Sequence, residues 1–542
     1  MNDRKNMNKL SHHIKAGDTA PFKNNAAFCI GTGRMNLALR HEYHKQLKKV
    51  QKEIGFSYIR GHGLFHDDMA VYHTYKTDGI AGSEDGFEKE EYNFTYIDLV
   101  FDDYLALGLK PFVELGFMPK QMASGAQTVF WWKGNVTPPS DYDKWARLVC
   151  AAIKHWINRY GLDEVKTWPF EVWNEPNLKV FWQDADMPEY FKLYDVTARA
   201  VKSCHPGLKV GGPAICGVND ELWMRMFLQY CKENNVPLDF VTRHAYGTEM
   251  PEADGHYVYQ QLRKPEEFML EPLGSRAIID SFPEYKDMEM HITEFNTSYS
   301  PLNPVHDTNQ NAAYVARLLS ELGDSCASYS YWTFGDVFEE AGVAFTPFSG
   351  CFGLLTNGSI PKPTYFTYVF YKNLYEKAVA KSENFIITKA ENGDLRGIAW
   401  NLVLENKLSP GGNSSEKTTN STKHEFSQFS LNDSHNSIII DLTIDVSNGT
   451  YFLLTKTVDE NHCNPLKNWI DMGSPAYPSK QQIKLLRECA KPLITTKQSE
   501  VKDELFSTTL NLSANAVCYF ELQKIVPQCD RGFRKERVPG AV

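Results

Sequence analysis

Two short segments of this chain each combine a glutamate with aromatic and amide side chains. They read Phe170-Glu171-Val172-Trp173-Asn174-Glu175-Pro176-Asn177 and His291-Ile292-Thr293-Glu294-Phe295-Asn296. In each segment a β-forming run leads into a glutamate, with groups beside it that can stack on a sugar or hydrogen-bond to it. Cleavage of a glycosidic bond requires two carboxyl groups that face each other across that bond. The pair Glu175 and Glu294 therefore predicts glycosidic chemistry.

This chemistry needs two carboxyl groups in different protonation states. One must carry a proton for the leaving oxygen, and the other must be ionised to attack the anomeric carbon. We predict Glu175 as the general acid/base and Glu294 as the nucleophile, with charge repulsion favouring protonation of Glu175. A retaining mechanism places the carboxyl groups roughly 5–5.5 Å apart, and an inverting one roughly 6.5–9.5 Å. The sequence leaves that distance open.

A structural role is the alternative for each glutamate taken singly. Glu175 could cap a helix or pair with a basic residue, and Glu294 could be a buried partner of an arginine. Clustering with aromatic and amide groups favours the catalytic interpretation for both. We also expect the polar ends of Asn296 and Tyr299 to orient the Glu294 carboxylate.

The elements that must position these residues alternate between β-type runs and amphipathic helices, from about residue 22 to about residue 375. The predicted strands are Ala27–Gly31, Ser57–Arg60, Lys110–Leu115, Trp168–Trp173, Lys209–Gly212, Phe240–Ala245, Glu289–Glu294 and Ala327–Thr333. Such alternation over this length predicts an α/β fold of the (β/α)₈ TIM-barrel type, with an open doubly wound sheet as the alternative. In a barrel, catalytic groups lie at the C-terminal ends of the strands. Glu175 follows the fourth predicted strand and Glu294 ends the seventh.

Other polar and aromatic residues fall at predicted strand ends. His244 and Tyr246 share one face at the end of the sixth strand because side chains alternate with period two. His62 lies just past the second strand. Trp332 ends the eighth and could form the floor under a sugar ring, and Glu339 and Glu340 follow it. Each histidine could instead be structural and Trp332 a core aromatic, but position at the strand ends favours the site.

The C-terminal part of the chain has a different pattern. After about residue 382, short β-type runs separated by Gly, Asn and Asp turns predict an antiparallel β-sandwich. The runs are Ile386–Lys389, Leu395–Leu402, Ser437–Val446, Tyr451–Lys456, Ser507–Leu512 and Ala516–Gln523. A Ser/Thr/Asn/Lys-rich stretch, about 409–434, interrupts them as a low-complexity loop. Residues Gln481–Ala490 predict an isolated helix.

Composition excludes several classes of function. The chain has 542 residues and a formal net charge of −10, with no long basic run, so we expect no nucleic-acid partner. We expect no membrane partner either, because no apolar run of spanning length occurs. The 11 cysteines form no CxxC pair, and the N-terminus lacks an apolar signal core, which together predict a cytoplasmic protein. No complete GxGxxG or HExxH motif occurs, so we expect no cofactor and no metal.

Motifs distributed over the whole predicted barrel resemble those of glycoside hydrolase family 39, and within it the bacterial β-xylosidases. They begin with Gly31-Thr32-Gly33-Arg34, Ile59-Arg60-Gly61-His62-Gly63-Leu64, Gly116-Phe117-Met118-Pro119 and Trp132-Lys133-Gly134-Asn135-Val136-Thr137-Pro138-Pro139. The segments around Glu175 and Glu294 match as well. The remaining matches are Gly211-Gly212-Pro213-Ala214, Arg243-His244-Ala245-Tyr246, Pro304-Val305-His306-Asp307-Thr308, Tyr331-Trp332-Thr333-Phe334 and Asp336-Val337-Phe338-Glu339-Glu340.

The resemblance implies a retaining, exo-acting β-xylosidase. Such an enzyme releases xylose from the non-reducing end of short β-1,4-xylo-oligosaccharides by double displacement, as in xylan degradation. The resemblance implies that the terminal xylose is bound by His62, Phe117, Asn174, Phe181, His244, Tyr246, Trp332, Glu339 and Glu340. It also implies a homo-oligomer, a tetramer in similar proteins, and an N-terminal segment (1–20) that joins the β-sandwich (376–542) beside the catalytic barrel (21–375).

Two alternatives stay open. The family also contains α-L-iduronidases, so this chain could act on a uronide or on another pentoside. A uronic acid needs a cationic side chain, whereas Glu339 and Glu340 would repel its carboxylate, which favours xylose. A carbohydrate-binding protein without catalysis is the second alternative, although both carboxyl groups are present.

Overall fold

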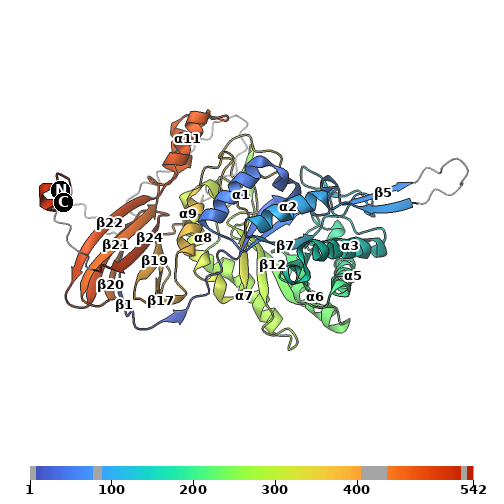
Figure 1. Ribbon diagram of the computed structural model, residues 1–542, viewed down its shortest axis with the longest axis horizontal. Helices are drawn as coiled ribbons and strands as arrows, with labels where there is room; N and C mark the ends of the chain where they lie inside the picture. Colours follow the sequence, from blue (N-terminus) through green and yellow to red (C-terminus); the bar gives the residue numbers. More distant parts are fainter. Residues whose placement is uncertain (1–7, 77–87, 405–435, 527–533, 541–542) are drawn as a thin grey trace, which may run out of the picture.

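A computed structural model describes residues 8–76, 88–404, 436–526 and 534–540 of the chain. The predicted low-complexity loop at about 409–434 lies outside the described residues. Figure 1 shows two parts: a barrel surrounded by helices, and at one end of the molecule a set of long strands that lie beside helices α8 (Asn309–Leu319) and α9 (Pro363–Lys372). Among the described residues, no helix combines the length and the apolar character needed to cross a bilayer.

The larger part is a closed barrel of eight parallel strands, which confirms the predicted (β/α)₈ fold. In chain order the strands are β3 (Cys29–Arg34), β4 (Tyr58–His62), β7 (Lys110–Leu115), β10 (Pro169–Val172), β11 (Lys209–Ile215), β12 (Phe240–Tyr246), β15 (Met290–Asn296) and β16 (Ser328–Tyr331). Strand β16 pairs with β3 and closes the ring. All eight strands overlap the predicted ones.

Helices surround the barrel on its outside. Besides α8 and α9 they are α1 (His41–Glu53), α2 (Thr95–Ala106), α3 (Tyr142–Tyr160), α5 (Met187–Cys204), α6 (Asp220–Glu233) and α7 (Pro265–Asp280), with the short α4 (Leu162–Val165) after α3. Helix α3 illustrates the sequence rule: its apolar stripe is buried, Asp141 caps its first turn, and Gly161 with a φ of 87° ends it. Strands β5 (Tyr72–Lys76) and β6 (Glu88–Tyr92) form an arm that projects from the far end of the barrel (Figure 1).

The C-terminal part consists of two facing sheets. The seven-stranded sheet has the order β2-β17-β18-β19-β24-β21-β22 and the three-stranded sheet the order β1-β20-β23. The strands are β1 (Asn8–Ile14), β2 (Ala20–Pro21), β17 (Lys377–Lys381), β18 (Phe385–Lys389), β19 (Leu395–Trp400), β20 (Ile438–Asp445), β21 (Gly449–Val458), β22 (Leu493–Val501), β23 (Leu505–Leu512) and β24 (Val517–Lys524). Alternate residues of β20 (Ile440, Leu442 and Ile444) enter the core between the sheets. The sandwich is antiparallel throughout except that β1 pairs in parallel with β20.

Some elements of this part were not predicted. Strand β22 lies at the edge of its sheet and is exposed along nearly its whole length, so its sequence lacks the alternation that marks a half-buried strand. Strand β17 and the short helix α10 (Pro465–Asp471) were missed for a similar reason, since neither carries a clear apolar stripe. The helix predicted at 481–490 is present as α11 (Lys480–Cys489).

Candidate active site

The two candidate catalytic carboxyl groups meet at the C-terminal rim of the barrel. Glu175 lies in the loop after β10, and Glu294 lies near the end of β15. Three atoms lie within 4.8 Å of one another: one carboxyl oxygen of Glu175, one of Glu294 and a ring nitrogen of His244. Both glutamates are buried, with 5% and 4% of their surface exposed. This separation matches the roughly 5–5.5 Å of retaining glycosidases better than the roughly 6.5–9.5 Å of inverting ones.

The loop after β10 is shaped to turn Glu175 into the barrel. Trp173 and Glu175 have φ values of 72° and 43°, in the left-handed region that non-glycine residues seldom adopt. The Glu175 amide donates to the Ala214 carbonyl at 3.0 Å. The Asn177 side chain donates to the Cys216 carbonyl at 2.6 Å. These bonds to the end of β11 and to the residue after it hold an unfavourable backbone conformation, as is common at functional sites.

Four side chains hold the Glu294 carboxylate. Arg60 donates to Oε1 at 2.6 Å and the Tyr246 hydroxyl donates to Oε2 at 2.7 Å. A ring nitrogen of His62 lies 3.3 Å from Oε1, and one of His244 lies 3.4 Å from Oε2. Burial alone would raise the pKa of Glu294, but attraction to His244, the His62 hydrogen bond and the Arg60 charge lower it well below its ordinary value. Glu294 is therefore an anion at neutral pH, as a nucleophile must be.

His244 also connects the two carboxyl groups. Its Nδ1 lies 2.8 Å from Glu175 Oε1. His244 and Tyr246 thus both enter the site from the end of β12, as their spacing predicts. The expectation that Asn296 orients Glu294 is wrong: the Asn296 amide donates to the Trp332 carbonyl at 2.6 Å instead. The ring of Tyr299 packs against that of Tyr246, at a centroid distance of 6.2 Å.

Arg60 is the centre of a buried polar network below the carboxyl pair. The side chain is fully buried, and its Nε donates to Glu171 at 2.5 Å. Its Nη2 lies 2.9 Å from Glu114 and donates to Asn174 Oδ1 at 3.0 Å. The Thr293 hydroxyl donates to the other oxygen of Glu171 at 2.7 Å. The network fixes Arg60 and Asn174 beside Glu294.

Sequence reasoning assigned no role to Arg60, Glu114 or Glu171. A usable signal was present, since each is a charged residue inside a run that otherwise reads as a buried strand. Such residues are seldom fully buried unless they are paired. Three of them on β4, β7 and β10 could therefore have predicted an ion-pair network inside the barrel.

Aromatic rings form the wall and floor around His62. The centroid of the His62 ring lies 5.8 Å from that of Phe117, 6.0 Å from Phe130 and 4.6 Å from Trp332. Phe130 contacts Phe181 at 5.4 Å. The structure thus brings the predicted residues Phe117, Phe181 and Trp332 together, and it adds Phe130. Such a surface suits the apolar faces of a sugar ring.

His62 itself is a cation at neutral pH. Its Nδ1 donates to Glu114 at 2.6 Å, deep in the barrel. Burial opposes the charge, but Glu114 and Glu294 together raise the pKa of His62 to about 10. The Arg60 guanidinium and His62 therefore place positive charge beside Glu294.

Glu339 and Glu340 differ in spite of being neighbours in the loop after β16. Glu339 accepts from Arg34 at 2.8 Å and from Arg40. Glu340 lies 4.0 Å from His62, and burial together with Glu294, Glu175 and Glu114 raises its pKa to about 8, against the charge of His62. Two arginines balance the charge of Glu339, and Glu340 is largely protonated at neutral pH. The expectation that both would repel an anion is therefore wrong.

A buried lysine connects the loops behind this site. Lys362 Nζ lies 2.7 Å from Asp307, after β15, and 2.8 Å from Asp336, after β16. It also donates to the Cys351 carbonyl at 2.6 Å. All three charged side chains are almost inaccessible to solvent, so the ion pairs hold the segment that leads to Glu339 and Glu340.

The Glu340 carboxyl allows a test through stability. Its pKa is higher in the folded state than the ordinary value of 4.5, so the unfolded chain releases this proton first as the pH rises. The free energy of unfolding therefore falls as the pH rises from about 4.5 to 8, by up to about 1.4 kcal/mol per pH unit. We expect Glu340→Gln to raise the free energy of unfolding relative to the parent at pH 8 but not at pH 5.

Glu339→Gln is the matched control. It removes the charge that faces Arg34 and Arg40, so it should lower the free energy of unfolding at both pH values. Denaturant unfolding at pH 5 and pH 8 measures both variants. A difference between parent and Glu340→Gln that does not change with pH would contradict the protonated state of Glu340.

Glu175, His244 and Glu294 have the spacing of a possible metal site among the described residues. Their surroundings disfavour a cation, because Arg60 and His62 already place positive charge beside Glu294. The expectation of no metal and no cofactor stays a prediction.

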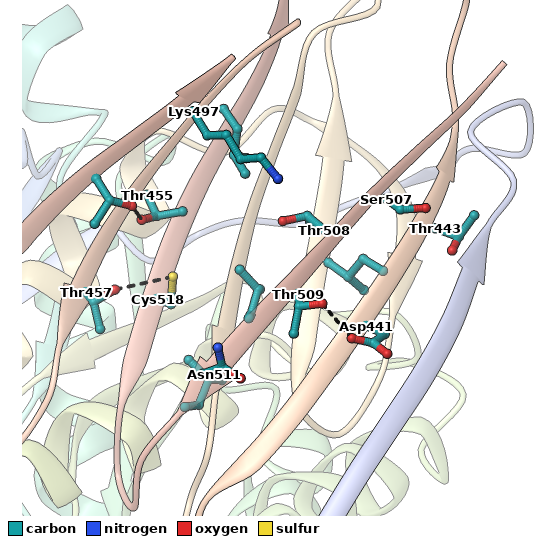
Figure 2. Close-up of a pocket in the computed structure, with 15 residues that line it drawn as sticks. Asp441, Thr443, Thr455, Thr457, Lys497, Ser507, Thr508, Thr509, Asn511 and Cys518 are labelled. Carbon is teal, nitrogen blue, oxygen red and sulfur yellow. Dashed lines mark hydrogen bonds between the residues drawn. The ribbon is translucent and has the colours of Figure 1, made fainter. Parts of the chain in front are cut away.

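An open hollow of about 670 Å³ lies elsewhere, on the β-sandwich between β20, β21, β22 and β23 (Figure 2). Threonine and serine hydroxyl groups, leucine side chains and the polar side chains of Asp441, Lys497 and Asn511 line it. Thr509 donates to Asp441 at 2.7 Å, and Thr457 to Cys518 at 3.6 Å. None of the described residues that line the hollow is aromatic, and they include no pair of facing carboxyl groups, so they lack the chemistry of the barrel site.

The barrel, the facing carboxyl pair and the aromatic wall define a glycoside hydrolase. Comparison with known proteins identifies its family. The family model for glycosyl hydrolases family 39 matches residues 12–504, and this chain belongs to that family.

Individual relatives cover nearly the whole chain. A β-xylosidase of Geobacillus stearothermophilus is 47% identical over 516 residues, which cover 95% of both chains. A β-xylosidase of Caldicellulosiruptor saccharolyticus is 36% identical over 487 residues, 89% of each. The crystal structure of a monomeric β-xylosidase from Caulobacter crescentus CB15 matches with a TM-score of 0.82 and 31% identity, covering 95% of this chain and 100% of that chain.

Proposed function

We propose that this enzyme is a retaining, exo-acting β-xylosidase that releases xylose from the non-reducing end of short β-1,4-xylo-oligosaccharides. The observation that carries the proposal is the approach of the Glu175 and Glu294 oxygens, within 4.8 Å, at the rim of the barrel. That separation leaves too little room for the water of an inverting mechanism. The choice of xylose is supported by the two β-xylosidases that resemble the chain over most of its length.

In the first step Glu294 attacks the anomeric carbon while Glu175 donates its proton to the leaving oxygen. Arg60 and Tyr246 hold Glu294 by hydrogen bonds of 2.6 and 2.7 Å, so its attacking oxygen is oriented before substrate binds. The product of this step is a covalent glycosyl-enzyme. In the second step Glu175, now ionised, takes a proton from water, and that water releases xylose with its configuration retained.

We assign the terminal xylose to the site lined by His62, Phe117, Asn174, Phe181, His244, Tyr246, Trp332 and Glu340. Glu339 belongs to the same proposal, although its carboxylate oxygens already accept from Arg34 and Arg40. Its contribution is then to hold the loop and to offer a remaining lone pair to a hydroxyl. The protonated Glu340 can both donate to and accept from sugar hydroxyl groups.

Xylose is favoured over a uronic acid because the cations near the site are already paired. Arg60 contacts Glu114, Glu171 and Glu294, while Arg34 and Arg40 contact Glu339. A uronate carboxylate would have to displace one of these protein carboxylates.

The experiment compares kcat/KM on an aryl β-xyloside and an aryl α-iduronide. We expect the xyloside to be cleaved faster by at least about 100-fold, since an unpaired buried carboxylate costs roughly 3 kcal/mol or more. NMR of the first-formed sugar should show β-xylose. Faster cleavage of the iduronide would overturn the substrate, and α-xylose as the first product would overturn retention.

The organisation of the protein is a separate part of the proposal. We propose a catalytic barrel at 21–375, a β-sandwich at 376–542 and an N-terminal segment at 1–20 that joins the sandwich, which the pairing of β1 with β20 supports. We further propose a homo-oligomer, a tetramer, in the cytoplasm. The ten described cysteines are free thiols, as is usual in a reducing compartment. Light scattering of the full chain tests the assembly, and a monomer would contradict it.

A further inference from the structure

We propose that Cys150 and Cys204, on the outer face of the barrel, form a reactive dithiol that a low-molecular-weight disulfide such as oxidised glutathione converts into an intramolecular disulfide. Cys150 lies in the middle of α3, and Cys204 is the last residue of α5. The proposal does not rest on the proposed substrate or on the roles of Glu175 and Glu294.

The two sulfur atoms lie in one small polar contact between the helices. Cys204 Sγ is 3.9 Å from the carbonyl oxygen of Cys150. Cys150 Sγ is 3.5 Å from the carbonyl of Ala200 and 3.6 Å from the hydroxyl of Ser203, the residue before Cys204. Each sulfur atom therefore lies close to the turn of helix that carries the other cysteine.

Formation of the disulfide requires the two sulfur atoms to move closer, and the end of α5 is the part of the contact that can shift. Helix α5 ends at Cys204, where the chain leaves the helix at His205. A residue at a helix end can shift more easily than one inside the helix, because fewer backbone hydrogen bonds constrain it. Residues Trp145 and Thr197, joined by a hydrogen bond of 2.7 Å, hold α3 and α5 together one turn or more away. We therefore expect the helices to keep their packing while the sulfur atoms approach.

The surroundings favour a thiolate at Cys150. The hydrogen bond from Cys204 lowers the pKa of Cys150 most; burial opposes this, and Ser203 and Lys154 assist, so that the pKa falls to about 6. The pKa of Cys204 is raised in turn by its hydrogen bond to Cys150. Both side chains are partly exposed to solvent. A thiolate that a small disulfide can reach is the nucleophile of thiol–disulfide exchange.

The reaction needs no oxidant other than oxidised glutathione. The Cys150 thiolate attacks one sulfur of oxidised glutathione, the glutathione S–S bond breaks, and a glutathione thiolate leaves and takes up a proton. Cys204 then loses its proton, and its thiolate attacks Cys150 Sγ in the mixed disulfide and displaces the second glutathione. The protein loses two electrons and two protons, and one oxidised glutathione becomes two reduced ones.

The other cysteines serve as internal controls. Among the described residues Cys29, Cys231, Cys326, Cys351, Cys463 and Cys518 are buried, and Cys216 and Cys489 are partly exposed. Cys489 lies in α11, far along the chain from both helices. It provides a single partly exposed thiol for comparison.

The experiment uses the full chain, incubated with oxidised glutathione and then with N-ethylmaleimide, and analysed by peptide mass spectrometry. We expect a cross-link between the peptides of Cys150 and Cys204, loss of maleimide labelling at both, and recovery of labelling after dithiothreitol. Cys204→Ser should stop at a glutathione adduct on Cys150, because the resolving thiol is absent. Cys150→Ser should leave Cys204 open to maleimide, and Cys489→Ser should keep the cross-link.

Two results would overturn the proposal. One is maleimide labelling of both Cys150 and Cys204 after oxidation. The other is a stable glutathione adduct on Cys150 of the parent protein with Cys204 still labelled, which would show that the second exchange does not occur. Because Cys→Ser changes one atom, circular dichroism should show the parent fold in each variant.

Discussion

Glu294→Ala is expected to lower kcat on an aryl β-xyloside by at least about 10⁴-fold, because the nucleophile of the covalent step is lost. Arg60 and Tyr246 orient the Glu294 carboxylate, and His244, His62 and Arg60 hold its pKa low against burial, so the variant loses an oriented anion. The loss should extend to every substrate, whatever its leaving group.

The fold should survive this substitution. Arg60 keeps Glu171 at 2.5 Å and Glu114 at 2.9 Å as partners after the Glu294 carboxylate is removed. Circular dichroism and a thermal unfolding curve close to those of the parent would check this point. Glu391→Ala is the control, since the Glu391 side chain is 94% exposed and its nearest cation lies 4.0 Å away. Turnover by Glu294→Ala at the rate of the control would end its assignment as nucleophile.

Glu175→Ala is expected to lower kcat/KM on xylobiose by about 10³- to 10⁴-fold, in the upper range for removal of a general acid. A substrate with a good leaving group, such as dinitrophenyl β-xyloside, needs no proton on its leaving oxygen. Its first step should be nearly unaffected, so that the glycosyl-enzyme accumulates. Pre-steady-state measurement should then show a burst of dinitrophenol.

Azide provides the second test of Glu175. A small anion can enter the space left by the carboxyl group and attack the glycosyl-enzyme without a general base. We expect azide to restore turnover of Glu175→Ala and to yield β-xylosyl azide. With Glu294→Ala, azide can only replace the nucleophile, so any azide product should have the opposite, α configuration. An equal loss of activity on xylobiose and on the dinitrophenyl substrate would contradict the acid/base role.

The barrel and the positions of the two candidate carboxyl groups could be predicted because their signals are local. Alternation of β-type runs with amphipathic helices located the eight strands, and the strand-end positions of Glu175 and Glu294 placed both on one rim. The shared face of His244 and Tyr246 followed from period-two alternation along β12. In the sandwich, strands with one buried face were found and the exposed edge strand β22 was missed.

The wrong expectations for Asn296, Glu339 and Glu340 have one physical cause, which is that each side chain is governed by partners distant in sequence. Asn296 was expected to orient Glu294 from two positions away, yet its amide reaches the Trp332 carbonyl, while Tyr246 from another strand orients the nucleophile. Glu339 and Glu340 look alike in sequence, yet one faces two arginines and the other a buried space beside His62. Their charge states depend on partners that neighbouring residues do not reveal.

The sequence by itself determined the kind of fold, the two carboxylates and the rim on which they lie, because hydrophobic period and strand order are properties of successive residues. Only the tertiary structure decided how close Glu175 and Glu294 come, which network around Arg60 keeps Glu294 ionised, and why Glu340 holds a proton. Those properties arise from burial and from charges that the closed barrel brings together from distant strands. Coulomb energy and desolvation depend on separations in space, and separation along the chain does not supply them.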